Sequence, residues 1–185
     1  MSAGAARALT SSALHDHFAL FGLPRVFGLD KEVLEKAYRD IQAQVHPDRF
    51  AHAGDAERRA SLQWTTRVNE AYRTLKDPVQ RGRHLLELHG VDVAFETNTQ
   101  MPTDFLMQQL ELREELEAAT GMKDPSRLDR LRAGLSASKK ALEKEIGAAI
   151  DAKRDYSGAA ELVRKLMFLD RLDSEIDVAY EAIEQ

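Results

Sequence analysis

Apolar residues recur at every third or fourth position through the first half of the chain, which is the spacing of amphipathic helices. One helix is predicted from Asp30, a suitable N-cap, to Val45, because Pro47 disfavours helical angles in the residue before it. A second is predicted from Asp55, its proposed N-cap, to Lys76. The apolar positions are Val33, Leu34, Ala37, Tyr38, Ile41 and Val45 in the first helix, and Leu62, Thr65, Val68, Tyr72 and Leu75 in the second. Two long helices joined by a short loop therefore form the centre of this half.

Shorter helices flank this pair. One is predicted over residues 14–20, and Asp77-Pro78 supplies a cap and a first-turn proline for another that stops at Gly90. Residues 91–103 have no helical phase and form a predicted linker. Beyond the linker lie three predicted helices, over residues 104–119, 125–154 and 158–184.

These elements predict an all-α fold with two modules. Aromatic residues make up only 6% of the chain, which argues against sheets, since strands draw on aromatic and β-branched residues. The predicted organisation is a flexible N-terminus (1–14), a helical hairpin with short flanking helices (15–90), the linker (91–103) and a three-helix bundle (104–185).

Charge is distributed unevenly between the halves. Residues 1–84 contain 13 Lys and Arg against 10 Asp and Glu, whereas residues 85–185 contain 13 against 21. The halves therefore suit different partners, and the first is too weakly basic for nucleic acid to be its main ligand. The chain has no cysteine, which excludes disulfides and thiolate metal sites. No apolar run is long enough to predict a membrane-spanning helix.

The tripeptide His46-Pro47-Asp48 lies between the two long helices and is the sharpest motif in the sequence. Pro47 lacks a backbone donor and stiffens the turn, so little conformational entropy is left to lose when a partner binds. Asp48 offers a carboxylate to an arginine of that partner. Taken alone, the tripeptide is equally consistent with an ordinary proline-containing loop. Its place in a helical hairpin favours a docking role.

The hairpin resembles a J domain. The resemblance includes the run Asn-Glu-Ala-Tyr-Arg-Thr-Leu at 69–75, followed by Asp77-Pro78 and Arg81. It implies that the tripeptide loop docks on an ATP-driven chaperone of the heat-shock-seventy class and stimulates its ATP hydrolysis. Four cations near the loop are candidates for steering an acidic chaperone surface, namely Lys31, Lys36, Arg39 and Arg49. Acidic residues intervene at Glu32, Glu35 and Asp40, so a dedicated partner is expected rather than a promiscuous one.

The helix over 104–119 has two apolar faces. Leu112 and Leu116 each fall within about 20° of Phe105 at 100° per residue, and the three residues form the stripe that a bundle buries. The second face has acidic edges and is expected to stay exposed for a partner. It consists of Leu106, Met107, Leu110, Glu111 and Glu114.

In the last helix one aromatic residue is out of phase with the core stripe. That stripe consists of Leu162, Leu166, Leu169, Ile176 and Tyr180. Phe168 lies about 100° from its centre, so it is predicted to point away from the core as an interface anchor. The competing interpretation is that both faces of the helix over 104–119 are buried and that Phe168 packs on the J domain. The middle helix keeps to one stripe of Leu128, Leu131, Leu135, Leu142 and Ile146, and is interpreted as structural.

The runs 105–116 and 163–170 resemble the C-terminal bundle of the HscB family, the J-type co-chaperones of iron–sulfur cluster biogenesis. With the J domain, the resemblance covers about residues 15–180. It implies an HscA-type chaperone and an IscU-type scaffold protein as partners. The positions that it assigns to scaffold binding are Leu106, Met107, Leu110, Glu111, Glu114 and Phe168. The cysteine pairs that hold zinc in animal members are missing here, which favours a bacterial, cytoplasmic form over an organellar one, with no metal, cofactor or membrane.

Two other functions are compatible with parts of the sequence. An enzyme would use His46 and Asp48 as an acid–base pair, but the chain lacks a nucleophile motif and a Gly-rich phosphate loop. His15 and His17 form only a weak zinc pair, and the other histidines, His52, His84 and His89, are predicted at the surface or at helix ends. The remaining possibility is a J-domain adaptor for a different client.

Overall fold

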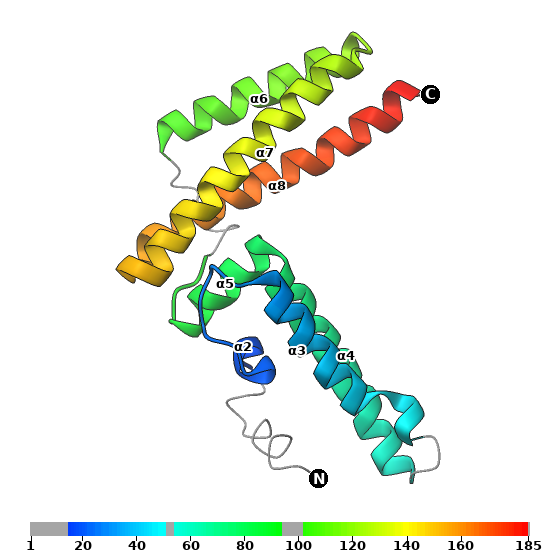
Figure 1. Cartoon of the computed structure of the whole chain (residues 1–185). Coiled ribbons are helices and arrows are strands. Elements are labelled where there is room, and N and C mark those ends of the chain that lie inside the picture. Colours follow the sequence, from blue (N-terminus) through cyan, green and yellow to red (C-terminus); the bar gives the residue numbers. More distant parts are fainter. Residues whose placement is uncertain (1–14, 51–53, 94–101, 185) are drawn as a thin grey trace. The chain divides into compact units, whose positions relative to one another are not determined.

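The computed structural model describes residues 15–50, 54–93 and 102–184, and every regular element in these ranges is a helix (Figure 1). The all-α prediction is therefore confirmed for the described part of the chain. The predicted flexible N-terminus and residues 94–101 of the predicted linker lie outside it. The chain divides into two compact units, residues 1–88 and 89–185. No described helix is both long enough and apolar enough to cross a membrane.

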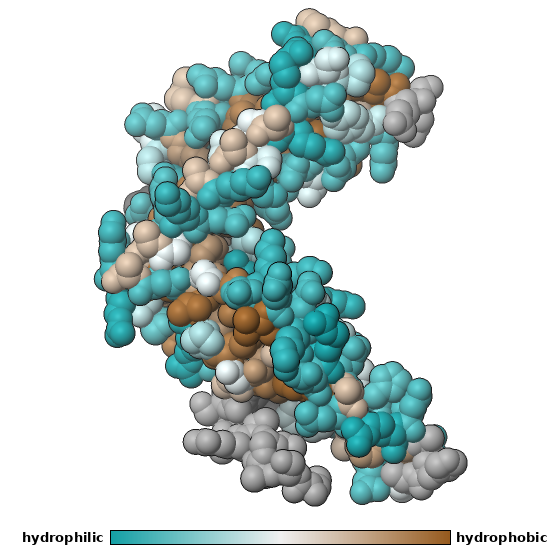
Figure 2. All heavy atoms as spheres, viewed as in Figure 1, coloured by the Kyte–Doolittle hydropathy of each residue, from teal (hydrophilic) through white to brown (hydrophobic). Residues whose placement is uncertain are grey.

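Unit 1 is built on an antiparallel hairpin of α3 (Lys31–Val45) and α4 (Asp55–Lys76). A short 3₁₀ helix, η1 (Pro47–Phe50), follows α3, and the small helices α2 (His17–Phe21) and α5 (Pro78–Leu88) complete the unit. Its core contains Phe18, Phe27, Leu34, Val68, Ala71, Leu75, Leu85 and Leu86. Figure 2 shows polar residues over most of the loop end of the hairpin, while apolar residues gather around α2 and the opposite end.

The caps of the two long helices differ from one another. Asp30 caps α3 as predicted, because its carboxylate accepts from the backbone N–H groups of Glu32 and Val33 at 2.8 and 3.3 Å. The predicted cap at Asp55 is wrong: Gly54 is the N-cap of α4 and provides no side-chain bond. Asp55 is instead the first helical residue, where its negative charge suits the helix dipole and pairs with Arg58 at 3.7 Å.

The prediction that His84 lies at the surface or at a helix end is wrong, because the residue is buried within α5. Its Nε2 accepts the backbone N–H of His17 at 3.1 Å, and the two imidazole rings stack with centroids 4.2 Å apart. Burial and the neighbouring His84 lower the pKa of His17 from 6.5 to about 4, and burial also lowers the pKa of His84. Both rings are therefore neutral at pH 7, and they join α2 to α5.

Acidification is expected to destabilise unit 1. Because both histidines have a lower pKa in the folded state, the unfolded chain binds more protons below about pH 6.5. The contribution of the two neutral histidines to the free energy of unfolding should be complete above that pH. It should be lost as the pH drops toward about 4. Urea titrations followed by the fluorescence of Trp64, the single tryptophan and a residue of α4, measure this directly. His84→Gln should flatten the dependence and the exposed His15→Gln should not; equal slopes in all three chains would contradict this account.

Unit 2 is a three-helix bundle of α6 (Thr103–Gly121), α7 (Pro125–Gly147) and α8 (Tyr156–Glu184). The predicted middle helix, 125–154, ends in a π-helical turn, η2 (Ala148–Lys153), and the chain reverses at Arg154 with φ +55°. The core residues are Phe105, Leu116, Ala119, Leu128, Leu131, Leu135, Phe168, Leu169, Leu172, Ile176 and Ala179. Residues 89–93 also belong to this unit: His89 stacks on Tyr156, and the Val93 carbonyl accepts from the buried Arg164 at 3.2 Å.

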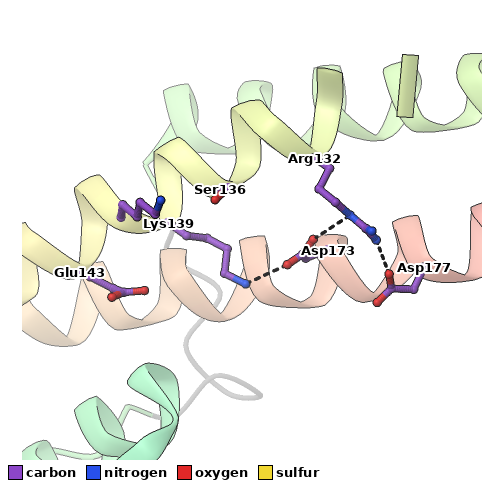
Figure 3. Close-up of a pocket in the computed structure, with 7 residues that line it drawn as sticks. Arg132, Ser136, Lys139, Glu143, Asp173 and Asp177 are labelled. Atoms are coloured by element: carbon purple, nitrogen blue, oxygen red, sulfur yellow. Dashed lines mark hydrogen bonds and ion pairs between the residues drawn. The ribbon is translucent and has the colours of Figure 1, made fainter. Parts of the chain in front are cut away.

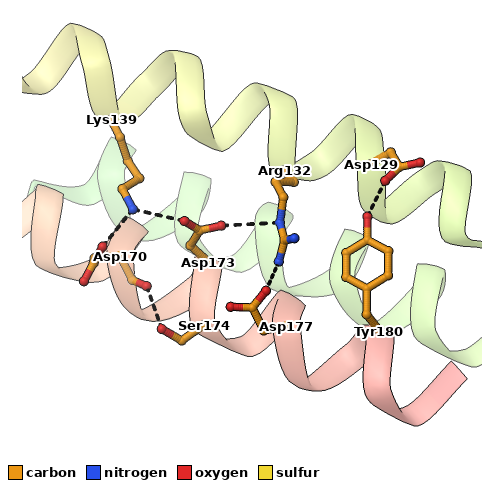
Figure 4. Close-up of polar contacts among 8 residues, drawn as sticks. All are labelled: Asp129, Arg132, Lys139, Asp170, Asp173, Ser174, Asp177 and Tyr180. Carbon is orange, nitrogen blue, oxygen red and sulfur yellow. Dashed lines mark hydrogen bonds and ion pairs between the residues drawn. The ribbon is translucent and has the colours of Figure 1, made fainter. Parts of the chain in front are cut away.

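Ion pairs join α7 to α8 along the outside of the bundle (Figure 4). Lys139 donates to Asp170 at 2.7 Å and to Asp173 at 3.1 Å, and Arg132 pairs with Asp173 and Asp177. Burial alone would lower the pKa of Lys139, but these two carboxylates outweigh it and raise the pKa. An open groove of about 440 Å³ runs between the helices (Figure 3). Lys139 and Arg132 line this groove and are already paired with carboxylates of α8. We therefore interpret the groove as part of the packing of α7 against α8.

Candidate functional site

The His46–Pro47–Asp48 tripeptide, hereafter the HPD loop, lies where α3 ends and η1 begins. The His46 side chain is 50% exposed and that of Asp48 is 90% exposed. The Asp48 backbone N–H donates to His46 Nδ1 at 3.3 Å, so a neutral His46 carries its proton on Nε2. The loop therefore presents an imidazole donor and a carboxylate acceptor to solvent.

Side chains donate to two carbonyls at the end of α3 that no helical N–H reaches. Continuing the helix would require an N–H at position 47 for the Ala43 carbonyl, and Pro47 has none. The Arg49 guanidinium donates to that carbonyl instead, at 3.0 Å. The Arg49 backbone N–H turns to His46 O at 3.1 Å, so it does not reach the Val45 carbonyl. That carbonyl accepts from side chains of α4.

Two hydroxyl groups of α4 contact the Val45 carbonyl, and the sequence did not single them out. Ser61 Oγ donates to it at 2.6 Å, and Thr65 Oγ1 lies 3.2 Å away. Periodicity places Thr65 in the apolar stripe of α4 and gives no role to Ser61, which is only 4% exposed. One sequence signal could have predicted this contact. It is a pair of hydroxyl residues four positions apart on the inner face of a helix whose partner helix ends at a proline.

The cations predicted to steer the chaperone are partly neutralised within the helix. Lys36 pairs with Asp40 at 2.6 Å and Arg39 with Glu35 at 3.8 Å, both at the i, i+4 spacing. Exposed pairs of this kind contribute little to stability. Acidic groups of a partner can therefore replace Asp40 and Glu35 beside these cations at a small cost in free energy. Lys31 is also exposed, whereas Arg49 is already engaged with α3.

The second predicted surface lies on α6. We call Leu106, Met107 and Leu110, with the neighbouring Glu111 and Glu114, the α6 patch. Its three apolar side chains are 47%, 54% and 52% exposed, and both glutamates are exposed. The opposite stripe of α6, with Phe105 and Leu116, is buried. The prediction that this helix has one buried and one exposed apolar face is therefore confirmed.

Phe168 does not point away from the core, so that prediction is wrong. It is 5% exposed and meets Phe105 edge to face, with ring centroids 5.7 Å apart. The physical reason is that α8 packs against both α6 and α7, so its buried stripe is wider than that of a helix with one neighbour. The guanidinium of Arg113 lies 5.9 Å from the ring centroid. Phe168 thus holds α6 in place from within the bundle.

Phe168→Ala is expected to destabilise unit 2 by about 3–5 kcal/mol, as truncation of a buried phenylalanine does. Thermal unfolding followed by circular dichroism measures the loss. Val178→Ala, on the same helix but with a side chain that is 65% exposed, is the matched control and should unfold almost like the native chain. A Phe168→Ala variant as stable as this control would contradict the packing described here.

No group of three or more His, Cys, Asp or Glu side chains within the described ranges is placed to hold a metal ion. His17 is committed to His84, and His52 lies outside the described residues. The surfaces described so far are a polar loop on unit 1 and an apolar patch with acidic edges on unit 2.

Comparisons with known proteins match each of the two units to a protein family. Residues 16–84 match the DnaJ domain family, and residues 101–177 match the family described as the HSCB C-terminal oligomerisation domain. A co-chaperone protein HscB homolog from Burkholderia mallei is 52% identical over 168 residues, which cover 91% of this chain and 95% of that protein. The homolog from Aromatoleum aromaticum is 49% identical, with 91% and 96% covered.

Solved structures give the same assignment. Chaperone HscB from Vibrio cholerae superposes with a TM-score of 0.78 at 36% identity, covering 91% of this chain and 99% of that one. The human co-chaperone protein HscB superposes with a TM-score of 0.82 at 29% identity, covering 88% and 81%.

Proposed function

Because this chain belongs to the HscB family of J-type co-chaperones of iron–sulfur cluster biogenesis, we propose that it stimulates the ATPase of an HscA-type chaperone and delivers an IscU-type scaffold protein to it. Such a co-chaperone is a non-catalytic regulator of a chaperone of the heat-shock-seventy class, not an enzyme. The observation that carries the proposal is that the HPD loop and the α6 patch are both exposed, on two compact units of one chain.

The HPD loop is the proposed chaperone contact. Asp48 presents its carboxylate to solvent and can accept a bidentate pair of hydrogen bonds from a chaperone arginine. Pro47 and the bonds that close the end of α3 reduce the freedom of the loop before docking. Lys31, Lys36 and Arg39 are proposed to attract an acidic surface of the chaperone. Arg49 contributes mainly through the shape of the loop.

The α6 patch is the proposed scaffold contact. Leu106, Met107 and Leu110 are the apolar anchors, and Glu111 and Glu114 favour a partner with basic groups beside its apolar surface. Phe168 supports this contact from beneath α6 through Phe105. The net negative charge of residues 85–185 acts in the same direction.

Carrying both surfaces on one chain has a thermodynamic consequence. Once the chaperone holds the HPD loop, a scaffold bound to the α6 patch is a tethered client, at an effective concentration that reaches the millimolar range for short linkers. The relatives above include bacterial proteins, which supports the proposal that this chain acts in the bacterial cytoplasm.

The proposal is tested by single-turnover ATP hydrolysis on a purified HscA-type chaperone, with this chain, with an IscU-type scaffold, and with both. We expect the two proteins together to accelerate hydrolysis more than the sum of their separate effects. Stimulation by the chain that the scaffold leaves unchanged would favour an adaptor for a different client. No stimulation by the chain would contradict the chaperone assignment.

A further inference from the structure

The junction between α3 and the HPD loop is held from below by α4. Ser61, which is 4% exposed, donates from Oγ to the Val45 carbonyl at 2.6 Å. Thr65 Oγ1 is within hydrogen-bonding distance of the same carbonyl, at 3.2 Å, and of the Ser61 carbonyl, at 2.9 Å. Val45 is the residue directly before His46, so these contacts lie one peptide unit from the loop.

The Val45 carbonyl is the acceptor whose direction matters most to the loop. Its carbonyl carbon forms the peptide bond to His46, so fixing the oxygen fixes the plane of the peptide through which the chain leaves α3. The backbone N–H of Arg49 does not hold it, because that group donates to the His46 carbonyl at 3.1 Å. The α4 hydroxyls therefore control the orientation of this peptide.

We propose that Ser61 and Thr65 are positioning residues for chaperone stimulation. They touch no partner themselves. They bond the last carbonyl of α3 and so preset the direction in which His46 and Asp48 project. This inference rests on the proposed docking of the HPD loop and adds the residues of α4 that prepare it.

Loss of these bonds should weaken docking more than it slows hydrolysis. With the Val45 carbonyl released, the loop samples additional orientations, and binding must order it again. A net hydrogen bond of ordinary strength corresponds to about a three- to tenfold change in an equilibrium constant. We therefore expect the concentration of this chain that gives half-maximal stimulation to rise by about three- to tenfold, with the maximal rate almost unchanged.

The test compares four variants of the full chain with the native protein in the chaperone ATPase assay, well below their melting temperatures. Ser61→Ala/Thr65→Val removes both hydroxyls, and Thr65→Val removes one while keeping the β-branched shape. Thr65→Ser keeps the hydroxyl and should behave like the native chain. Thr66→Val is the matched control, because Thr66 is exposed and its hydroxyl donates to the Leu62 carbonyl of its own helix at 3.1 Å.

Amide hydrogen exchange at Asp48 and Arg49 is a second measurement. At low temperature, a general loss of stability would not accelerate exchange at these two amides alone. We expect faster exchange at these amides in the two valine-containing Thr65 variants only, with the shift in half-maximal concentration following it. If the double variant keeps the native half-maximal concentration while the native chain stimulates the chaperone, the inference is overturned and the proposed function stands. If the native chain does not stimulate, the proposed function itself is wrong. If the double variant does not fold, the half-maximal concentrations of Thr65→Val and Thr65→Ser are compared. Equal values for these two variants would overturn the inference.

Discussion

His46→Gln is expected to reduce stimulation of the chaperone ATPase to the unstimulated rate. Glutamine preserves the polarity of His46 but not the rigid ring that places a donor at Nε2 while Nδ1 accepts from the Asp48 N–H at 3.3 Å. The side chain is half exposed and takes no part in the core of unit 1. The fold should therefore survive the change while the docking surface does not. Single-turnover hydrolysis with saturating variant measures the effect.

The control for this result is His15→Gln, the same substitution at an exposed position before α2. It should stimulate like the native chain, and circular dichroism should report the same helix content and melting temperature for both variants. Undiminished stimulation by His46→Gln would remove the HPD loop from the mechanism. Lost stimulation with a lowered melting temperature would instead show that His46 is needed for folding.

The second large effect is expected at the α6 patch. Leu106→Ala and Leu110→Ala should each weaken scaffold binding by about 1–3 kcal/mol, as truncation of an interface anchor does. Both side chains are about half exposed in the free chain, at 47% and 52%, so truncation should cost unit 2 little stability. Calorimetric titration of an IscU-type scaffold into each variant, and into the double variant, measures the loss.

Met122→Ala is the control here, because Met122 is an exposed apolar residue, at 66%, just beyond the end of the same helix. Its affinity for the scaffold should equal that of the native chain. The Leu106→Ala/Leu110→Ala variant should also keep its stimulation of the chaperone in the absence of scaffold, because the HPD loop is untouched. Native scaffold affinity in the double variant would show that the α6 patch is not the contact.

Local signals were sufficient to locate α3 and α4 in the sequence and to predict the start of α5. Asp30 marks the start of α3, Pro47 follows its last residue by two positions, and Asp77-Pro78 separates α4 from α5. Each of these signals acts within a few residues of the backbone that it controls. The exposed face of α6 was also predictable, because helical phase separates Leu106 and Leu110 from Phe105.

Features that depend on a third element could not be derived in the same way. Phe168 is out of phase with one stripe of α8, yet it is buried because α6 covers it through Phe105. His84 is buried because α2, distant in sequence, donates its first N–H to the ring. Ser61 binds Val45 across 16 positions. Periodicity describes one helix against one neighbour, so it does not specify contacts that a second neighbour creates.

The central claim is that the HPD loop and the α6 patch must act on one and the same chain. Scaffold-stimulated ATP hydrolysis should be measured with an equimolar mixture of the His46→Gln and Leu106→Ala/Leu110→Ala chains, at concentrations where sedimentation shows each to be monomeric. Each variant alone should lack the scaffold-dependent part of the stimulation, and the mixture should lack it as well, since neither chain can hold the chaperone and the scaffold together. Recovery of native stimulation in the mixture would contradict delivery by a single tethered chain.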